Sequence, residues 1–182
     1  NILGVRHSLE AFIDFSLDGP HAPLLLNNES WLKDLGYLAF LRAYGSHFTV
    51  NRLLSFDSVK TRLERESPLS FLEFNYILIQ AYDFLHLNKT YDCSLQIGGS
   101  DQWANILNGH ELIRKLEKKP SFALTFPIIE NASGQKMGKT LSGAVWLNAA
   151  LTKPYEYWQY WRNVDDTDVV RLLKLYTELP LE

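Results

Sequence analysis

One apolar segment of the chain carries polar side chains at helical spacing. Residues 69–87 are hydrophobic almost throughout, but Glu73, Tyr76, Gln80 and Asp83 interrupt them at intervals of three, four and three. This spacing places the four side chains on one face of a helix. Because the rest of the segment is apolar, we expect the helix to be buried.

The polar groups on this helix need hydrogen-bond partners, because a buried carboxylate or amide is costly without them. One interpretation is that they bond to one another or to the neighbouring backbone. The other is a polar pocket in which Gln80 and Asp83 bind a hydroxyl or an ammonium group, with Tyr76 beside them. Such a pocket rejects ligands that lack the polar group, because its own groups would then be left unpaired.

A second set of polar side chains surrounds a pair of glycines. An expected strand runs into Gly98 and Gly99, a helix is expected to follow, and Gln96, Asp101 and Gln102 lie next to the pair. Paired glycines let the backbone approach a ligand closely, and ligands of open α/β sheets lie at the carboxyl ends of strands. A Gly-Gly turn alone is more often a tight connection. With these polar neighbours, the cluster predicts a ribose or amino-acid site.

A polar, glycine-containing loop is expected at residues 131–143. It carries Lys136 and Lys139, three residues apart, followed by Thr140. Lysine ammonium groups on such a loop can stabilise a triphosphate as charge develops during a reaction. The alternative is a solvated surface loop. The segment lacks the spacing of a P-loop.

These candidate residues need elements that position them, and strands alternating with helices indicate an α/β fold with a parallel sheet. Helices are expected at residues 1–16, 30–44, 55–66, 68–87, 102–118, 154–162 and 166–177. Strands are expected at residues 24–26, 92–97 and 122–129, and residues 145–147 form a further short apolar run. We therefore predict a partial Rossmann-like sheet followed by a small all-helical segment.

The composition of the 182 residues is that of a globular protein, with 46% hydrophobic and 21% charged residues. The net charge of -3 does not indicate a nucleic-acid-binding protein by itself, so a polyanionic partner would have to meet a local basic patch. No apolar run approaches the roughly 20 residues that a membrane-spanning helix needs. The single cysteine, Cys93, excludes an intrachain disulfide. Because Met137 is the only methionine, we expect the chain to be a fragment.

Three motifs in this order resemble those of bacterial and mitochondrial tyrosyl-tRNA synthetases. They are QAYDF at residues 80–84, QIGGSDQW at residues 96–103 and KMGKT at residues 136–140. The last motif is similar to the KMSKS signature of class I synthetases in a variant form. Residues 27–31 and 47–51 also match the family's pattern, so the resemblance covers essentially the whole chain.

The resemblance implies a substrate, L-tyrosine, and the residues that bind it. Asp83 would accept a hydrogen bond from the phenol hydroxyl, and Tyr76 and Gln80 would hold the amino group. Gln102 would lie near the carboxylate, and Gln96 would support the substrate. A carboxylate and an amide on one helix turn also suit a phenol better than an indole, which offers only a donor.

The resemblance also implies an ATP site. Gly98 and Gly99 would line the nucleotide, Asp101 would bind the ribose, and Ile128 and Ile129 would flank the adenine. ATP would act as a substrate together with Mg²⁺, and no metal held by protein ligands is expected.

The catalytic residues implied by the resemblance are Lys136, Lys139 and Thr140. They would stabilise the ATP phosphates while the tyrosine carboxylate attacks, with Lys136 and Lys139 also counted among the ATP-binding residues. Such chemistry needs no covalent enzyme group, because it depends on positioning and on charge stabilisation in the transition state.

The chain departs from the family's pattern in two respects. The first signature of the family, HIGH, is absent, so the first strand and its binding residues are expected to be missing and the fragment alone is expected to be inactive. Ala104 also stands where many relatives carry glycine. Residues 1–147 are expected to be the second half of the catalytic domain with its connective insert, and residues 148–182 the start of the helical domain after the lysine loop.

The whole protein is expected to be a tyrosine–tRNA ligase that binds L-tyrosine, ATP and tRNA(Tyr). It is expected to form a homodimer with Phe71 near the two-fold interface, to be independent of membranes, and to work in the bacterial cytoplasm or, alternatively, the mitochondrial matrix. Two other interpretations of its function remain: a non-catalytic relative that binds structured RNA, and a tryptophan-specific synthetase. The polar residues Gln80 and Asp83 favour the enzyme, since an RNA scaffold needs no phenol-binding pocket.

Overall fold

The computed structural model describes residues 2–140 and 143–180, with the side chains of residues 139, 140 and 143 left undescribed. It divides into two compact units. Unit 1 comprises Asn1–Asn27 together with Ile129–Glu182, and unit 2 comprises Asn28–Ile128. The expected boundary between residues 147 and 148 falls inside unit 1, and the functional division that it describes stays a prediction.

The elements of unit 2 begin with short helices and end with a strand–helix–strand arrangement. In chain order they are α2 (Glu29–Leu32), α3 (Tyr37–Ala43), the 3₁₀-helix η1 (Gly45–His47), α4 (Val50–Leu54), α5 (Asp57–Glu64), α6 (Phe71–Tyr91), β1 (Leu95–Gly99), the 3₁₀-helix η2 (Ser100–Gln102), α7 (Trp103–Leu116) and β2 (Phe122–Phe126). Unit 1 contains α1 (Ile2–Leu9), β3 (Lys139–Thr140), β4 (Gly143–Ala144), α8 (Pro154–Arg162) and α9 (Asp166–Tyr176). None of the helices in the described part of the chain combines the length and hydrophobicity that crossing a bilayer requires.

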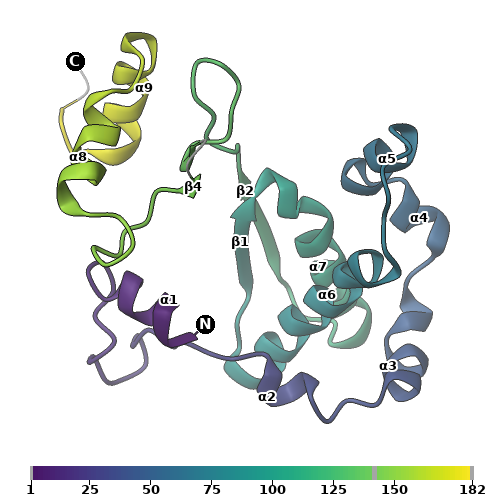
Figure 1. Cartoon of the computed structure of the whole chain (residues 1–182). Helices are drawn as coiled ribbons and strands as arrows, with labels where there is room; N and C mark the ends of the chain where they lie inside the picture. Colours follow the sequence, from purple (N-terminus) through teal and green to yellow (C-terminus); the bar gives the residue numbers. More distant parts are fainter. Residues whose placement is uncertain (1, 141–142, 181–182) are drawn as a thin grey trace. The chain divides into compact units, whose positions relative to one another are not determined.

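Two parallel strands form the sheet of unit 2. β1 pairs with β2 in a register that runs from Leu95 opposite Phe122 to Gly99 opposite Phe126. The connection between them is helical, through η2 and α7, as parallel neighbours require. Figure 1 shows α7 lying along the two strands with α6 next to it. The predicted α/β class is confirmed.

The long helix α6 begins at a capping box. The Ser70 hydroxyl accepts a hydrogen bond from the Glu73 N–H at 3.2 Å, and the Glu73 carboxylate accepts from the Ser70 N–H at 2.9 Å. Arg62 Nη1 lies 2.7 Å from Glu73 Oε1. Together with the backbone N–H and the hydroxyl of Ser70, Arg62 lowers the pKa of Glu73 to about 2. Glu73 therefore organises the start of the helix and is not part of the polar stripe that its spacing predicted.

Two apolar clusters pack on successive parts of α6. The first consists of Phe40, Leu53, Val59, Ile77 and Leu78, which come from α3, α4, α5 and α6. The second consists of Ala81, Phe84, Leu85, Leu112 and Ile113, all fully buried, and joins α6 to α7. The expectation that α6 is buried throughout is wrong at its first turn, where Phe71 and Leu72 are 69% and 72% exposed.

Several expected elements differ in the structure. The helix expected at residues 1–16 is α1, which ends at Leu9. The strand expected at residues 92–97 is shifted to Leu95–Gly99, so the glycine pair belongs to β1. Residues 24–26 form no strand, and Leu24 is 64% exposed. Pro23 immediately before this run removes a backbone donor that pairing would use. The single helix expected at residues 30–44 is two helices, α2 and α3, because Gly36 adopts an extended conformation and begins the second.

Gly109 allows the close approach of α7 to α6. A Cβ atom at this position would lie 2.9 Å from both Cβ and Cδ1 of Phe84 and 3.4 Å from the Ala81 backbone. Phe84 is fully buried in the second cluster and has no space into which to move. A side chain at position 109 would therefore separate the two helices.

We expect Gly109→Ala to lower the free energy of unfolding of the full-length protein by about 1–3 kcal/mol, the cost of overpacking a core. Gly4→Ala in α1 is the matched control, because a Cβ there meets nothing within 4 Å. The control should raise stability slightly, by about 0.5–1 kcal/mol. Urea unfolding followed by circular dichroism measures both changes, and equal effects of the two substitutions would contradict the packing argument.

Candidate functional site

The Asp83 carboxylate, on α6, is held by two side chains from the start of unit 2. Trp31 Nε1 donates to one carboxylate oxygen at 2.8 Å, and Asn28 Nδ2 donates to the other at 3.0 Å. The Trp31 ring also stacks on His86, one turn along α6, with centroids 4.4 Å apart. A carboxylate has about four lone-pair sites, so two of them remain for a further donor.

The protonation of Asp83 is set by opposing effects. Partial burial raises its pKa, while the hydrogen bonds from Trp31 and Asn28 and the nearby His86 lower it, and the net shift is upward. A raised carboxyl pKa means that the folded state binds the proton more tightly than the unfolded chain. Ionisation of Asp83 therefore weakens the fold as the pH rises through its pKa.

Asn105 connects the two amide side chains that the sequence predicted for the site. Its Nδ2 donates to Gln80 Oε1 at 2.9 Å and to Gln102 Oε1 at 3.2 Å. The structure thus brings Gln80 of α6 together with Gln102 at the start of α7. Because both amide oxygens face Asn105, the amide nitrogen of Gln102 is left to donate elsewhere, as binding a carboxylate would require.

The glycine pair lies at the carboxyl end of β1, where η2 turns back on the strand. A Cβ at Gly99 would lie 2.6 Å from the Asp101 carboxylate and 3.9 Å from Ile128. A Cβ at Gly98 would lie 3.0 Å from both Gln102 Cβ and Ile106 Cδ1. The two glycines therefore let the chain pack on itself, and they bring Asp101, Gln102 and Ile128 to the strand end.

Gln96 and Tyr76 complete the predicted set in unit 2. The Gln96 side-chain oxygen is buried and has no hydrogen-bond partner among the described residues. An unpaired buried acceptor costs about 1–3 kcal/mol, which a ligand donor would recover. Tyr76 lies on α6 one turn before Gln80, and its side chain is 57% exposed.

The remaining predicted residues belong to unit 1. Ile129 and Lys136 lie on the two arms of a β-hairpin, because Met137 N–H donates to Ile129 O at 2.8 Å and Glu130 forms an antiparallel bridge with Lys136. The backbone of Lys139 and Thr140 forms β3, which pairs with β4. The side chains of Lys139 and Thr140 lie outside the described part of the structure. The loop expected at residues 131–143 thus contains a hairpin and the strand β3.

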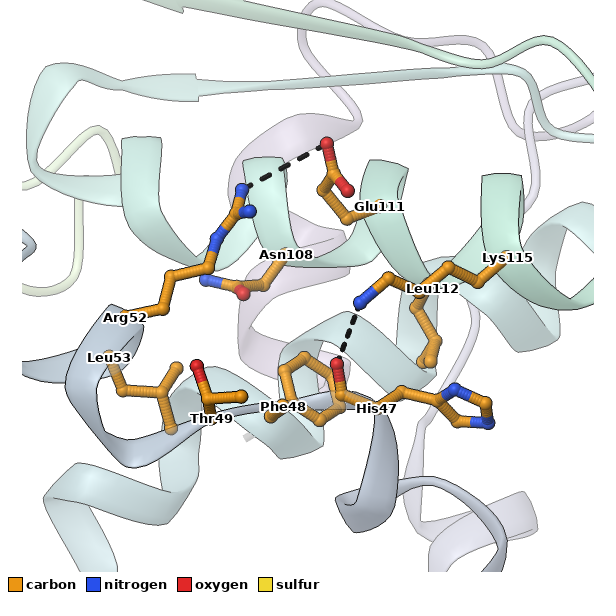
Figure 2. Close-up of a pocket in the computed structure, with 9 residues that line it drawn as sticks. All are labelled: His47, Phe48, Thr49, Arg52, Leu53, Asn108, Glu111, Leu112 and Lys115. Atoms are coloured by element: carbon orange, nitrogen blue, oxygen red, sulfur yellow. Dashed lines mark hydrogen bonds and ion pairs between the residues drawn. The ribbon is translucent and has the colours of Figure 1, made fainter.

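A small pocket elsewhere in unit 2 contains none of the predicted site residues. Figure 2 shows its lining, which comes from the segment around η1 and α4 and from α7. Its polar groups bond to one another: Lys115 donates to the His47 carbonyl at 2.7 Å, and Arg52 lies 3.9 Å from Glu111. Arg114 and, more weakly, Arg52 lower the pKa of Glu111. These pairs make the pocket a structural feature of the helix packing.

Three residues that position the site were not assigned roles from the sequence. Asn28 and Trp31 were noted only as part of a family pattern, and Asn105 was missed. The signal for Asn105 was its position three residues after Gln102, on the same face of a helix. Among residues 2–140 and 143–180, no three His, Cys, Asp or Glu side chains gather as a metal site.

The fold and the polar cluster now allow the chain to be assigned to a family. The family model for class I tRNA synthetases specific for tryptophan and tyrosine matches residues 1–182. The chain belongs to this family.

Among its relatives, the chain is similar to enzymes named for tyrosine. It is 59% identical over 182 residues to the tyrosine–tRNA ligase of Caulobacter sp. (strain K31) and 57% identical over 181 residues to that of Ruegeria pomeroyi. It spans 43% and 44% of the lengths of these two relatives. The predicted resemblance to bacterial tyrosyl-tRNA synthetases is confirmed.

Solved structures of similar fold are two C-terminally truncated mitochondrial tyrosyl-tRNA synthetases. The one from Coccidioides posadasii has a TM-score of 0.76 at 27% identity, covering 98% of this chain and 53% of that one. The one from Aspergillus nidulans has a TM-score of 0.72 at 28% identity, covering 98% and 52%. Both matches agree with the predicted Rossmann-like class.

We expect Trp31→Phe to raise the pKa of Asp83 further. The phenyl ring can still stack on His86, but the N–H that lowers the carboxyl pKa is lost. Asp83 should then remain protonated to a higher pH than in the unsubstituted protein. A ¹³C titration of the aspartate carboxyl groups in the full-length protein, assigned with Asp83→Asn, measures the shift. Trp158→Phe on α8 is the control and should leave the Asp83 titration unchanged.

Proposed function

We propose that the full-length protein containing this chain is a tyrosine–tRNA ligase. The observation that carries the proposal is the Asp83 carboxylate, fixed by Trp31 and Asn28 with acceptor sites still available. A phenol hydroxyl is a donor that fits such an acceptor, and a carboxylate held rigidly in place binds it selectively. The relatives at 57–59% identity are named as tyrosine–tRNA ligases, which favours this substrate over tryptophan.

The tyrosine site in this proposal consists of residues from α6, β1 and the start of α7. Asp83 binds the phenol, and Gln80 and Tyr76 bind the ammonium group. The Gln102 amide nitrogen donates to the carboxylate, since Asn105 holds its oxygen. Gln96, whose oxygen is buried and unpaired among the described residues, supports the substrate through a donor such as the ammonium group.

The ATP site in this proposal lies at the carboxyl end of β1. Asp101 binds the ribose hydroxyls, which suit a carboxylate acceptor. Gly98 and Gly99 line the nucleotide, and Ile128 and Ile129 flank the adenine. Mg²⁺ would arrive with ATP as part of the substrate.

The reaction is a transfer of the adenylyl group. A tyrosine carboxylate oxygen attacks the α-phosphorus of ATP, the bond to the bridging oxygen breaks, and pyrophosphate leaves with its electron pair. Lys136, Lys139 and Thr140 stabilise the charge that develops on the phosphates. The tyrosyl group then passes to a hydroxyl at the 3′ end of tRNA(Tyr), and AMP leaves. We place this activity in the bacterial cytoplasm, with the mitochondrial matrix as the alternative.

Asp83→Ala should largely abolish the preference for tyrosine over phenylalanine. A site built to bind a hydroxyl can reject the analogue without it by about 10⁴–10⁵-fold, and this factor should collapse in the variant. Tyrosine- and phenylalanine-dependent ATP–pyrophosphate exchange by the full-length protein gives the ratio. Glu73→Ala on the same helix is the control, because the Glu73 carboxylate bonds to Ser70 and Arg62, which are not among the proposed site residues. It should alter stability and leave the ratio intact. An unchanged ratio in Asp83→Ala would count against the assignment.

We also propose that the full-length protein is a homodimer with Phe71 at its interface. Phe71 and Leu72 expose adjacent apolar side chains at the start of α6, and such a pair suits an isologous contact. Phe71→Asp should shift the protein from dimer to monomer in light scattering at micromolar concentration. Leu3→Asp, at another exposed apolar position, on α1, should not. A dimer that persists in Phe71→Asp would contradict this placement.

A further inference from the structure

The segment that carries Lys136 is a compact hairpin, which we call the lysine hairpin and define as Ile129–Met137. Its arms are joined by hydrogen bonds from Met137 N–H to Ile129 O and from Asn131 N–H to Gln135 O, both 2.8 Å. Its tip is organised by the Asn131 side-chain oxygen, which accepts from the backbone N–H groups of Ser133 and Gln135 at 3.1 and 2.8 Å. The hairpin has internal order but contributes no side chain to the apolar clusters of the described structure.

The helices α8 and α9 hold the hairpin through its backbone. Both oxygens of the Asp168 carboxylate take part: one accepts from Ala132 N–H at 2.7 Å, and the other accepts from Arg171 at 2.7 Å. Arg171 in turn donates to the Glu130 carbonyl. Directly after the second arm of the hairpin, Gly138 N–H donates to the Tyr160 hydroxyl at 3.1 Å. Both arms are therefore tied to the same pair of helices.

Asp168 is a buried carboxylate that holds the backbone of the lysine hairpin. Asp168 is 5% exposed, whereas most charged side chains of the chain are at the surface, and a buried carboxylate must be paired to be tolerated. Its partners are one guanidinium and one backbone N–H of the hairpin, which are charge-assisted bonds of the stronger kind. The cap of α9 is a different residue, Asp165, whose carboxylate accepts from Thr167 N–H at 2.9 Å.

The two helices that provide the tethers are fixed to each other. Trp161 of α8 and Tyr176 of α9 pack edge to face with ring centroids 5.1 Å apart, and Tyr160 packs on Trp161 at 5.5 Å. Partial burial raises the pKa of Tyr176, whose side chain stays 52% exposed. The tethers on the hairpin therefore come from two helices that contact each other.

We propose that Asp168, with Arg171 and Tyr160, is a positioning residue that holds the lysine hairpin so that Lys136 meets the phosphates of ATP. The inference rests on the proposed function, in which the lysines stabilise the transition state. A lysine side chain is a long point charge, so its placement depends on the backbone that carries it. A displacement of about 1 Å in a group that acts on a transition state can reduce the rate about 10²-fold.

The test uses the full-length protein with Asp168→Asn, which keeps the size of the side chain but removes its charge and one acceptor. Single-turnover formation of tyrosyl-adenylate should slow by about 10²-fold, while the equilibrium dissociation constant for tyrosine stays close to that of the unsubstituted protein. Asp165→Ala, which removes the cap of the same helix without touching the hairpin, should leave the rate unchanged. Equal slowing in both variants would overturn the proposal, because the effect would then reflect the stability of α9.

A double-mutant cycle distinguishes an effect on the position of the lysines from a general loss of stability. In a background carrying Lys136→Ala and Lys139→Ala, Asp168→Asn should have little further effect on the rate, because no ammonium group remains to be misplaced. An undiminished effect in that background would refute the inference. If Asp168→Asn does not fold, Tyr160→Phe takes its place, since it removes only the hydroxyl that accepts from Gly138.

Hydrogen exchange separates this inference from the proposed function. The Ala132 amide should exchange faster in Asp168→Asn and the Gly138 amide faster in Tyr160→Phe, with or without activity. Unchanged exchange would show that the tethers do not hold the hairpin and would overturn the inference. A full-length protein that exchanges pyrophosphate with no dependence on tyrosine would instead overturn the proposed function, and the amide measurements would still decide whether the hairpin is held.

Discussion

The packing of α7 against α6 at Gly109 decides where the polar side chains of unit 2 can meet. Phe84 contacts the backbone of Gly109, and one turn earlier on each helix Gln80 accepts a hydrogen bond from Asn105. The Gln80–Asn105 contact lies four residues before the Phe84–Gly109 contact on both helices, so the two helices run in the same direction along this interface. Any change in the separation or register of the helices at Gly109 is therefore transmitted to the amides of the candidate site. Gly109 in the core and the Asn105 amide in the candidate site therefore belong to the same helix–helix interface.

The order of elements around the glycine pair could be predicted because its signals are local. A β-rich run, two glycines and an amphipathic helix specify a strand–turn–helix unit from neighbouring residues alone, and the parallel pairing follows from the helical connection. The strand predicted at residues 24–26 is wrong for the opposite reason. The hydrophobicity of this run favours a buried strand, but strand pairing depends on a neighbour that local sequence does not reveal, and Leu24 is exposed.

The side-chain network of the site was less predictable than the backbone. Asp83 was identified as an acceptor, but its donors Trp31 and Asn28 precede it by 52 and 55 residues, and no local pattern connects them. Glu73 matched the helical spacing of the site residues and yet belongs to the capping box. Spacing assigns a side chain to a face of a helix, and the partner that it finds there depends on tertiary packing. The lysine segment shows the same limit, because its polar residues build a hairpin that composition alone describes as a loop.

The environment of Asp83 reflects a compromise between selectivity and ionisation. Burial strengthens a hydrogen bond to a ligand by excluding water, but it also raises the pKa of the carboxyl and so favours the protonated form. Trp31 and Asn28 counter that shift with two N–H groups, each of which stabilises the ionised acceptor. They also restrict the carboxylate to one orientation, so that its remaining lone pairs are directed before any ligand arrives. A ligand without a donor would leave these lone pairs unpaired in a partly desolvated position, at a cost that a solvated carboxylate would not impose. The two donors therefore do more than balance a charge: they turn a partly buried carboxylate into a directional acceptor.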